Sequence, residues 1–152
     1  MRWGDFEHAA AEIAAAGRRL LTGPDGVAIG FLATVGDGSV HISPVCPIFC
    51  RSSLFLIAVE GSPKTSDLRI RGAYALHAFL GQNDEEFQIA GRAAEIVDAE
   101  ERADVHGSVR FAAFNRSDPI FALDVDRALW VYWERVGQPD TKAVRRRWAP
   151  AS

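Results

Sequence analysis

Apolar residues recur near the start of the chain at spacings of three and four. They are Phe6, Ala9, Ala10, Ile13, Ala16, Leu20 and Leu21. This spacing places them on one face of an α-helix, and Asp5 at the start and Gly23 just past the end are typical of helix boundaries. The pattern therefore predicts an amphipathic helix over residues 5–21.

Most of the other apolar residues fall in short runs that are separated by glycine, proline and aspartate. The predicted strands cover residues 27–35, 39–50, 53–60, 74–80, 85–97, 119–125 and 128–135. These runs are rich in the β-branched and aromatic residues that favour strands. The predicted turns are Asp37-Gly38, residues 81–84 and Asp126-Arg127. Pro44 and Pro47 cannot donate ladder hydrogen bonds, so part of the segment 39–50 is expected at a sheet edge.

Three further helices are predicted between the strands. One begins at Ser62 with Pro63 in the first helical position and ends near residue 71. Another begins at Asp98, where Glu101 completes a capping-box pattern, and a third covers residues 108–116. Six or seven mostly antiparallel strands without a strand–helix alternation predict a mainly β fold, a barrel with peripheral helices. Residues 1–152 are expected to form one domain with a polar, basic tail over residues 137–152.

Composition and charge narrow the class of protein. The 152 residues are 48% hydrophobic and 24% charged, with a formal net charge of -3, which is typical of a globular domain. A mildly acidic chain is not expected to bind nucleic acid. Its apolar runs are far shorter than the roughly 20 residues that cross a bilayer, so no membrane span is expected. The charged first twenty residues hold no apolar signal core, which favours a cytoplasmic location.

The cysteine and histidine residues point to no metal or disulfide chemistry. Cys46 and Cys50 lie four apart in one predicted strand, where a bridge is difficult to close, so both are expected to be reduced core thiols. The histidines are scattered without the paired spacing of zinc sites. No metal site is therefore expected.

The tetrapeptide Ser62-Pro63-Lys64-Thr65 is the most informative motif. A helix start attracts anions, and a cation such as Lys64 in the first turn is favourable when a phosphate occupies the site. The sequence predicts phosphate binding here, with an ordinary capped helix and a solvated lysine as the alternative.

Two other segments have both a functional and a structural interpretation. His41, Ser43 and Val45 share one face of a predicted strand, which could receive a flat ring or could face a helix or another subunit. The basic run 142–147 is either solvated or binds a phosphate or carboxylate. The aromatic residues of the segment 129–133 indicate core or a subunit interface.

Six segments taken in order resemble the pyridoxamine 5'-phosphate oxidase-like family of flavin-binding split barrels. They are Gly30-Phe31-Leu32-Ala33-Thr34-Val35, His41-Ile42-Ser43-Pro44-Val45, Ser62-Pro63-Lys64, Asp67-Leu68-Arg69, Ala75-Leu76-His77 and the run of residues 86–93. The resemblance covers roughly residues 5–133. It implies a six- to seven-stranded antiparallel split β-barrel that forms a homodimer, with flavin mononucleotide (FMN) between the subunits.

The resemblance also implies a set of cofactor-binding residues. They are His41, Ile42, Ser43, Pro44, Val45, Ile57, Ala58, Ser62 and Lys64, with Trp133 approaching the cofactor of the other subunit. The implied function is an FMN-dependent oxidoreductase that transfers hydride to or from a small organic substrate. The alternatives are a deazaflavin-dependent reductase on the same fold and a protein that binds flavin or another small ligand without turnover.

The chain departs from the oxidases at two places. Pro63 precedes Lys64 where the oxidases carry an adjacent basic pair, so one phosphate ligand is missing. The chain is also shorter and lacks their substrate-phosphate signature near the C-terminus. Oxidation of pyridoxamine phosphate itself is therefore not the expected activity.

Overall fold

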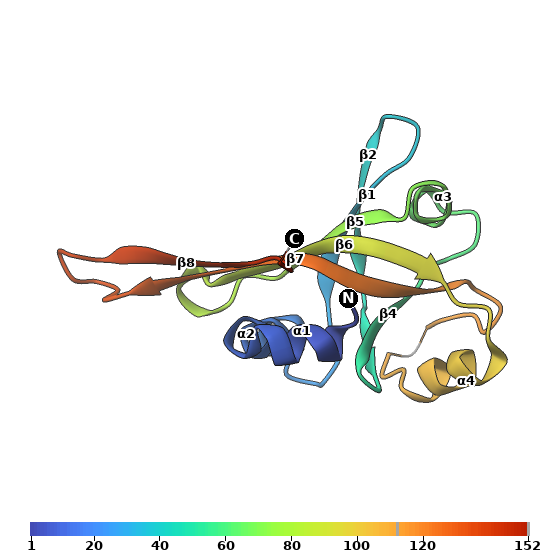
Figure 1. Cartoon of the computed structure of the whole chain (residues 1–152), viewed down its shortest axis with the longest axis horizontal. Coiled ribbons are helices and arrows are strands. Elements are labelled where there is room, and N and C mark those ends of the chain that lie inside the picture. The colour runs from blue at the N-terminus through green and yellow to red at the C-terminus, as the bar shows by residue number, and fades with distance from the viewer. Residues whose placement is uncertain (112, 152) are drawn as a thin grey trace.

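The computed structural model describes residues 1–111 and 113–151, and within these residues eight strands form one antiparallel sheet (Figure 1). The strands are β1 (Gly30–Val35), β2 (Val40–Val45), β3 (Ile48–Cys50), β4 (Ser53–Ile57), β5 (Ala73–Ala78), β6 (Glu86–Glu95), β7 (Ile120–Glu134) and β8 (Lys142–Trp148). The helices are α1 (Trp3–Ala9), α2 (Ala11–Leu21), α3 (Pro63–Ile70) and α4 (Ala99–Gly107), with a short 3-10 turn at Gln82–Asp84. The predicted mainly β fold is confirmed.

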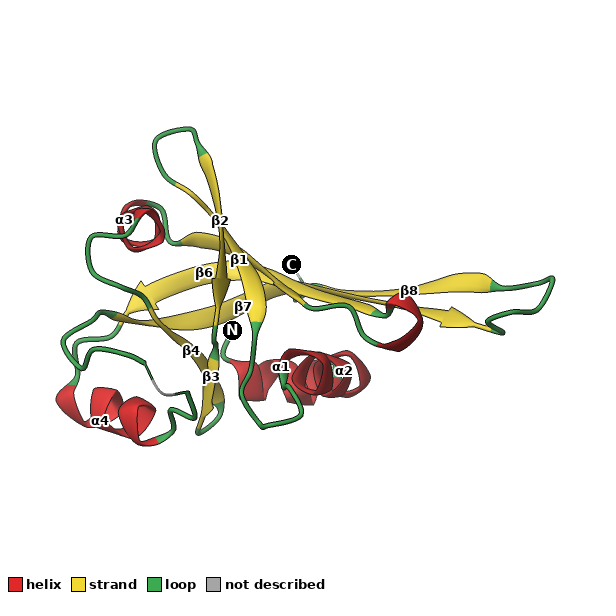
Figure 2. Cartoon of the chain, turned by 180° about the vertical axis from the view of Figure 1, so that it is seen from behind, coloured by secondary structure: helices red, strands yellow, loops and turns green. Residues whose placement is uncertain are grey.

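The long strand β7 organises the sheet. The strands follow the order β2-β1-β5-β6-β7-β4-β3, and β8 also pairs with β7. The first half of β7 pairs with β4, and its second half pairs with β8. Since the two halves have different neighbours, the sheet curls into a half-barrel and the β7–β8 ribbon projects from it (Figures 1 and 2).

The core fills the inner side of the curled sheet. Leu32, Leu76 and Ile89 face inward from neighbouring strands and are almost completely buried. The helices α1 and α2 cover the core from one side, where the Trp3 and Phe6 rings pack edge to face with centroids 5.3 Å apart. On the other side α3 inserts Leu68 into the same cluster (Figure 1).

The predicted helix over residues 5–21 is two helices. Ala10 adopts φ -147° and ψ 58°, which ends α1 at Ala9 before α2 begins at Ala11. The break turns the short α1 so that Trp3 and Phe6 both reach the core, a tertiary requirement that the continuous apolar spacing does not reveal.

The predicted strand over residues 39–50 is divided between opposite edges of the sheet. Its first half is β2 and its second half is β3, with Cys46 and Pro47 in the connection. Proline removes a ladder donor, and the chain changes neighbours at Pro47. The expected edge position is confirmed, because β2 pairs only with β1 and places Pro44 opposite Phe31.

The predicted Asp126-Arg127 turn is a β-bulge inside one continuous strand. Gly91 pairs with Val125 and Ala90 pairs with Arg127, so Asp126 is an extra residue in β7. A Cβ atom at Gly91 would collide with the carbonyl oxygen of Asp124, which explains the glycine opposite the bulge. The bulge keeps β7 paired with β6 where a turn would have separated two strands.

Two other predictions were wrong. The segment 108–116 is not a helix in its described residues, because Ser108 ends α4 by donating from both its amide and its hydroxyl to Asp104 O; residue 112 lies outside the described residues. The basic tail is not a tail, since its residues 142–148 form β8. Positive φ angles at Arg135 and Gly137 form the turn that returns the chain to β7.

The other helix starts agree with the sequence. The amide of Glu101 donates to Asp98 Oδ1 at 2.8 Å, which is the predicted cap of α4. The helix α3 begins at Pro63 after Ser62, as predicted. In the described part of the chain no helix combines the length and the apolar character that crossing a membrane requires.

Candidate functional site

A pocket of about 260 Å³ opens where the ends of β2 and β4 meet the first turn of α3. It is lined by Ile29, Pro44, Val45, Cys46, Ile57, Val59, Lys64, Phe111 and Ala113. We call this the Lys64 pocket. Four of the predicted cofactor-binding residues therefore come together from three separate elements, and they are Pro44, Val45, Ile57 and Lys64.

The start of α3 is held against the segment that follows β4 by hydroxyl groups. Thr65 Oγ1 donates to Val59 O at 2.8 Å and lies 3.0 Å from Ser62 Oγ. The Ser62 hydroxyl therefore bonds to Thr65 and does not cap the backbone amides of the helix. The backbone amides of Thr65 and Ser66 instead donate hydrogen bonds to the Ser62 carbonyl oxygen.

Lys64 is available to a ligand. It forms no ion pair with any described residue, whereas the other lysine of the chain, Lys142, lies 3.3 Å from Glu134. Its neighbours in the pocket are mainly apolar side chains, and α3 directs the positive end of its dipole to the same place. The rim of the Lys64 pocket is therefore suited to an anionic group.

His41 is held by α3 and does not line the pocket. Its Nδ1 lies 2.7 Å from Asp67 Oδ2, and Thr34 Oγ1 donates to the same oxygen at 2.7 Å. Burial alone would raise the pKa of Asp67, but the hydrogen bonds from His41 and Thr34 outweigh it and hold that pKa below its ordinary value. Gly36 leaves room for this carboxylate, since a Cβ there would collide with Asp67 Oδ1.

The remaining predicted residues lie apart from the pocket. Ile42 points to the outer face of β2, while Ser43 is half-buried on the same side of the strand as His41. Ala58 has no exposed surface. Trp133 lies on the β7–β8 ribbon, at the opposite end of the molecule from α3 (Figure 1), and its contact with a cofactor would require a second copy of the chain.

Comparison with solved structures decides the fold. A candidate pyridoxamine 5'-phosphate oxidase from Listeria innocua superposes with a TM-score of 0.59 at 13% identity, over 78% of this chain and 94% of that chain. The chain has the fold of the pyridoxamine 5'-phosphate oxidase-like split barrels. Neither protein-family models nor curated protein sequences give a match.

Two Mycobacterium smegmatis proteins share this split barrel. An FAD-binding protein gives a TM-score of 0.60 at 16% identity, over 93% of this chain and 97% of that chain. A haem-binding protein gives a TM-score of 0.58 at 18% identity, over 85% of this chain and 57% of that chain. This chain therefore spans little more than half the length of the haem-binding protein. At these identities the likeness concerns the fold.

The split barrel brings residues to the Lys64 pocket that the sequence did not indicate. Val59 could have been found, because it lies three residues before Ser62 in a predicted strand, but Phe111 comes from the segment that was wrongly predicted as a helix. Cys46 is a free, half-exposed thiol of the pocket wall and not a core residue, while Cys50 is buried. Burial, with a smaller effect of Asp25, raises the pKa of Cys46, so its thiol stays protonated and is a poor nucleophile.

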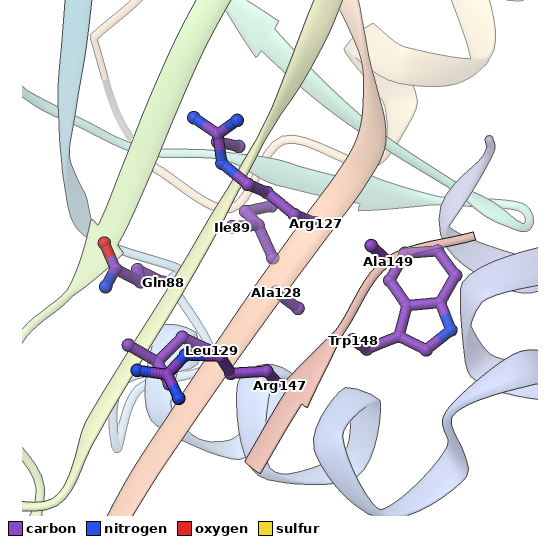
Figure 3. A pocket seen from close by; sticks show the side chains of 9 residues that line it. Gln88, Ile89, Arg127, Ala128, Leu129, Arg147, Trp148 and Ala149 are labelled. Atoms are coloured by element: carbon purple, nitrogen blue, oxygen red, sulfur yellow. The ribbon is translucent and has the colours of Figure 1, made fainter. Parts of the chain in front are cut away.

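A second pocket of the split barrel, of about 410 Å³, lies on β6, β7 and β8 (Figure 3). It is lined by Gln88, Ile89, Ala90, Arg127, Ala128, Leu129, Arg147, Trp148 and Ala149. We call this the arginine pocket. Over residues 1–111 and 113–151 no cluster of three or more histidine, cysteine or acidic residues is arranged to hold a metal ion.

Proposed function

We propose that this split barrel binds FMN with its phosphate at Lys64 and acts as a flavin-dependent oxidoreductase on a small organic substrate. The observation that carries the proposal is the position of Lys64, a cation without an ion pair among the described residues, at the rim of an apolar pocket and in the first turn of α3. Two structural neighbours, an FAD-binding protein and a candidate pyridoxamine 5'-phosphate oxidase, support a flavin as the ligand.

The residues present suit the two ends of this cofactor. Lys64 and the first turn of α3 would hold the phosphate by charge-assisted hydrogen bonds. The edge strand β2 leaves backbone groups unpaired beside Pro44 and Val45, and these groups would bind the polar edge of the ring. The pocket is smaller than the roughly 300–1,000 Å³ of most ligand sites, so we expect a second copy of the chain to enclose the rest of the cofactor.

The outer face of the sheet offers a surface for that second copy. Large apolar side chains lie exposed along β1, β2 and the end of β5: Phe31 (40% exposed), Val40 (65%), Ile42 (69%) and Phe79 (47%). The Phe31 and Phe79 rings pack together with centroids 4.9 Å apart, and Ile42 and Val40 project from the same face of the neighbouring strand β2. Patches of this kind mark interfaces. We propose a homodimer in which Trp133 of one copy approaches the cofactor of the other.

The chain's own residues would bind and position the reactants. FMN, when bound, supplies the hydride-transfer chemistry. The Asp67 carboxylate holds His41 through its Nδ1 and so fixes β2 beside the start of α3. The apolar walls of Val45 and Ile57 would exclude water from the ring.

The spectrum of freshly purified protein tests the proposal. We expect flavin absorbance bands, FMN identified by mass after denaturation, and reduction of the bound flavin by NADH or NADPH followed by transfer to an added acceptor. Release of a deazaflavin or haem would overturn the choice of cofactor, and bound FMN that no donor reduces would make the chain a binding protein. A colourless single subunit that takes up no FMN at millimolar concentration would overturn the proposal entirely.

A further inference from the structure

The arginine pocket gathers positive charge from two strands on one face of the sheet. Gln88, Leu129 and Arg147 are paired across β6, β7 and β8, so their side chains point to the same side. Arg127 lies two residues before Leu129 and shares that side (Figure 3). The lining contains no aspartate or glutamate, and among the described residues Arg127 and Arg147 form no ion pair.

The strand geometry separates the arginines of the run 145–147. Arg146 points to the inner side, where it is paired with Trp130 and lies 4.0 Å from Glu12. Arg147 points to the outer side and lines the pocket. Arg145 lies two residues earlier in β8 and points to the same side, opposite Val131, but it does not line the pocket. Only one member of the basic run therefore serves the pocket.

Apart from Gln88 and the two arginines, the lining of the arginine pocket is apolar. Ala90 and Leu129 provide side chains, and the Trp148 ring turns away to pack 4.8 Å from Phe6. The volume of about 410 Å³ exceeds what a simple inorganic anion needs and falls in the usual range for small-molecule ligands. Figure 3 shows the guanidinium groups of Arg127 and Arg147 on either side of the Gln88 amide. Guanidinium groups bind carboxylates and phosphates with paired hydrogen bonds, so an acidic head on a compact organic body would draw these side chains together over the apolar floor.

We propose that the arginine pocket binds a small organic anion, with Arg127 and Arg147 holding a carboxylate or phosphate head and Gln88 donating from its amide. The site is separate from the Lys64 pocket, with which it shares no residue. The proposal therefore does not depend on flavin binding.

Titration calorimetry of the full chain with benzoate, phenyl phosphate, benzamide and inorganic phosphate tests the site. We expect benzoate or phenyl phosphate to bind, and the tighter of the two identifies the preferred head. Benzamide, which has the same body without the charge, should bind at least about tenfold more weakly, the scale of a lost charge-assisted hydrogen bond. Inorganic phosphate should also bind more weakly than the better organic anion.

Variants locate the binding. Arg127→Gln and Arg147→Gln should each lower the affinity for the better organic anion by roughly tenfold or more. The matched control Arg145→Gln removes the same charge from the same face, and Lys64→Ala removes the cation of the other pocket; both should leave the affinity within about twofold. Equal binding of benzamide, no binding of either organic anion, unchanged affinity in both pocket variants, or loss of binding in Lys64→Ala would each overturn the proposal.

Discussion

His41 and Thr34 share one oxygen of the buried Asp67, each at 2.7 Å. Thr34 and His41 are directly paired across β1 and β2, and Asp67 lies on α3. This single carboxylate therefore joins the first hairpin of the sheet to the helix that carries Lys64. The position of Lys64 therefore depends on a hydrogen-bond network that lies one helical turn away.

Asp67→Asn should destabilise the protein. Asparagine adds an amide donor where Thr34 and His41 both donate, so we expect the free energy of unfolding to fall by about 1–3 kcal/mol. Urea unfolding measures this loss. Asp37→Asn in the exposed β1–β2 turn is the matched control and should change stability by less than about 0.5 kcal/mol. Equal stability of the two variants would show that the network contributes nothing.

The same carboxylate predicts an acid dependence of stability. The pKa of Asp67 in the folded chain lies below its ordinary value of 3.8, so its ionised form stabilises the fold above that pH. That contribution is lost as the pH falls from about 3.8 through the lower folded pKa. Stability measured against pH should therefore decline less steeply below about pH 4 in Asp67→Asn than in the natural chain. Parallel curves would contradict the assignment.

Lys64→Ala should weaken FMN binding by about 1–3 kcal/mol, the contribution of a charge-assisted hydrogen bond to a phosphate. The fold should stay intact, because Lys64 has no ion pair with the described residues. Fluorescence titration with FMN gives the affinity, and Lys142→Ala on the ribbon is the matched control. Unchanged affinity in Lys64→Ala would remove the phosphate site from α3.

Trp133→Ala should act on assembly and not on the single chain. The ring is 43% exposed, so its removal should change the unfolding of an isolated subunit by only about 0.5 kcal/mol. If it contacts a cofactor held by a second copy, flavin affinity and dimer formation should both decrease. Sedimentation and FMN titration measure these quantities, with the exposed Val97→Ala as the control. A stable, flavin-loaded dimer of the variant would contradict the role of Trp133.

Gly17→Ala should be costly because of close packing. A Cβ at Gly17 would overlap the ring of Phe87 in the core, whereas a Cβ at Gly107 would meet nothing within 4 Å. We expect a loss of about 1–3 kcal/mol for Gly17→Ala from overpacking, and about zero or a small gain for Gly107→Ala in a helix. Thermal unfolding of both variants checks this contrast.

The helix starts near the candidate site were predictable because their signals are local. The Ser62-Pro63-Lys64 start of α3 depends on neighbouring residues, and so does the cap at Asp98, so both were read correctly. The arginine pocket was not predictable, because it depends on which residues of β6, β7 and β8 are in register. A one-residue change of register would have turned Arg147 inward and Arg146 outward.

The sequence by itself determined the mainly β class, the starts of α3 and α4 and the cation at the start of α3, because turn residues, caps and alternation act over a few neighbouring positions. Only the tertiary structure decided the break at Ala10, the bulge at Asp126 and the strand formed by the basic C-terminal residues. Each of these depends on partners distant in the chain: Trp3 and Phe6 filling the core, Gly91 admitting the bulge, and β7 supplying hydrogen bonds to β8.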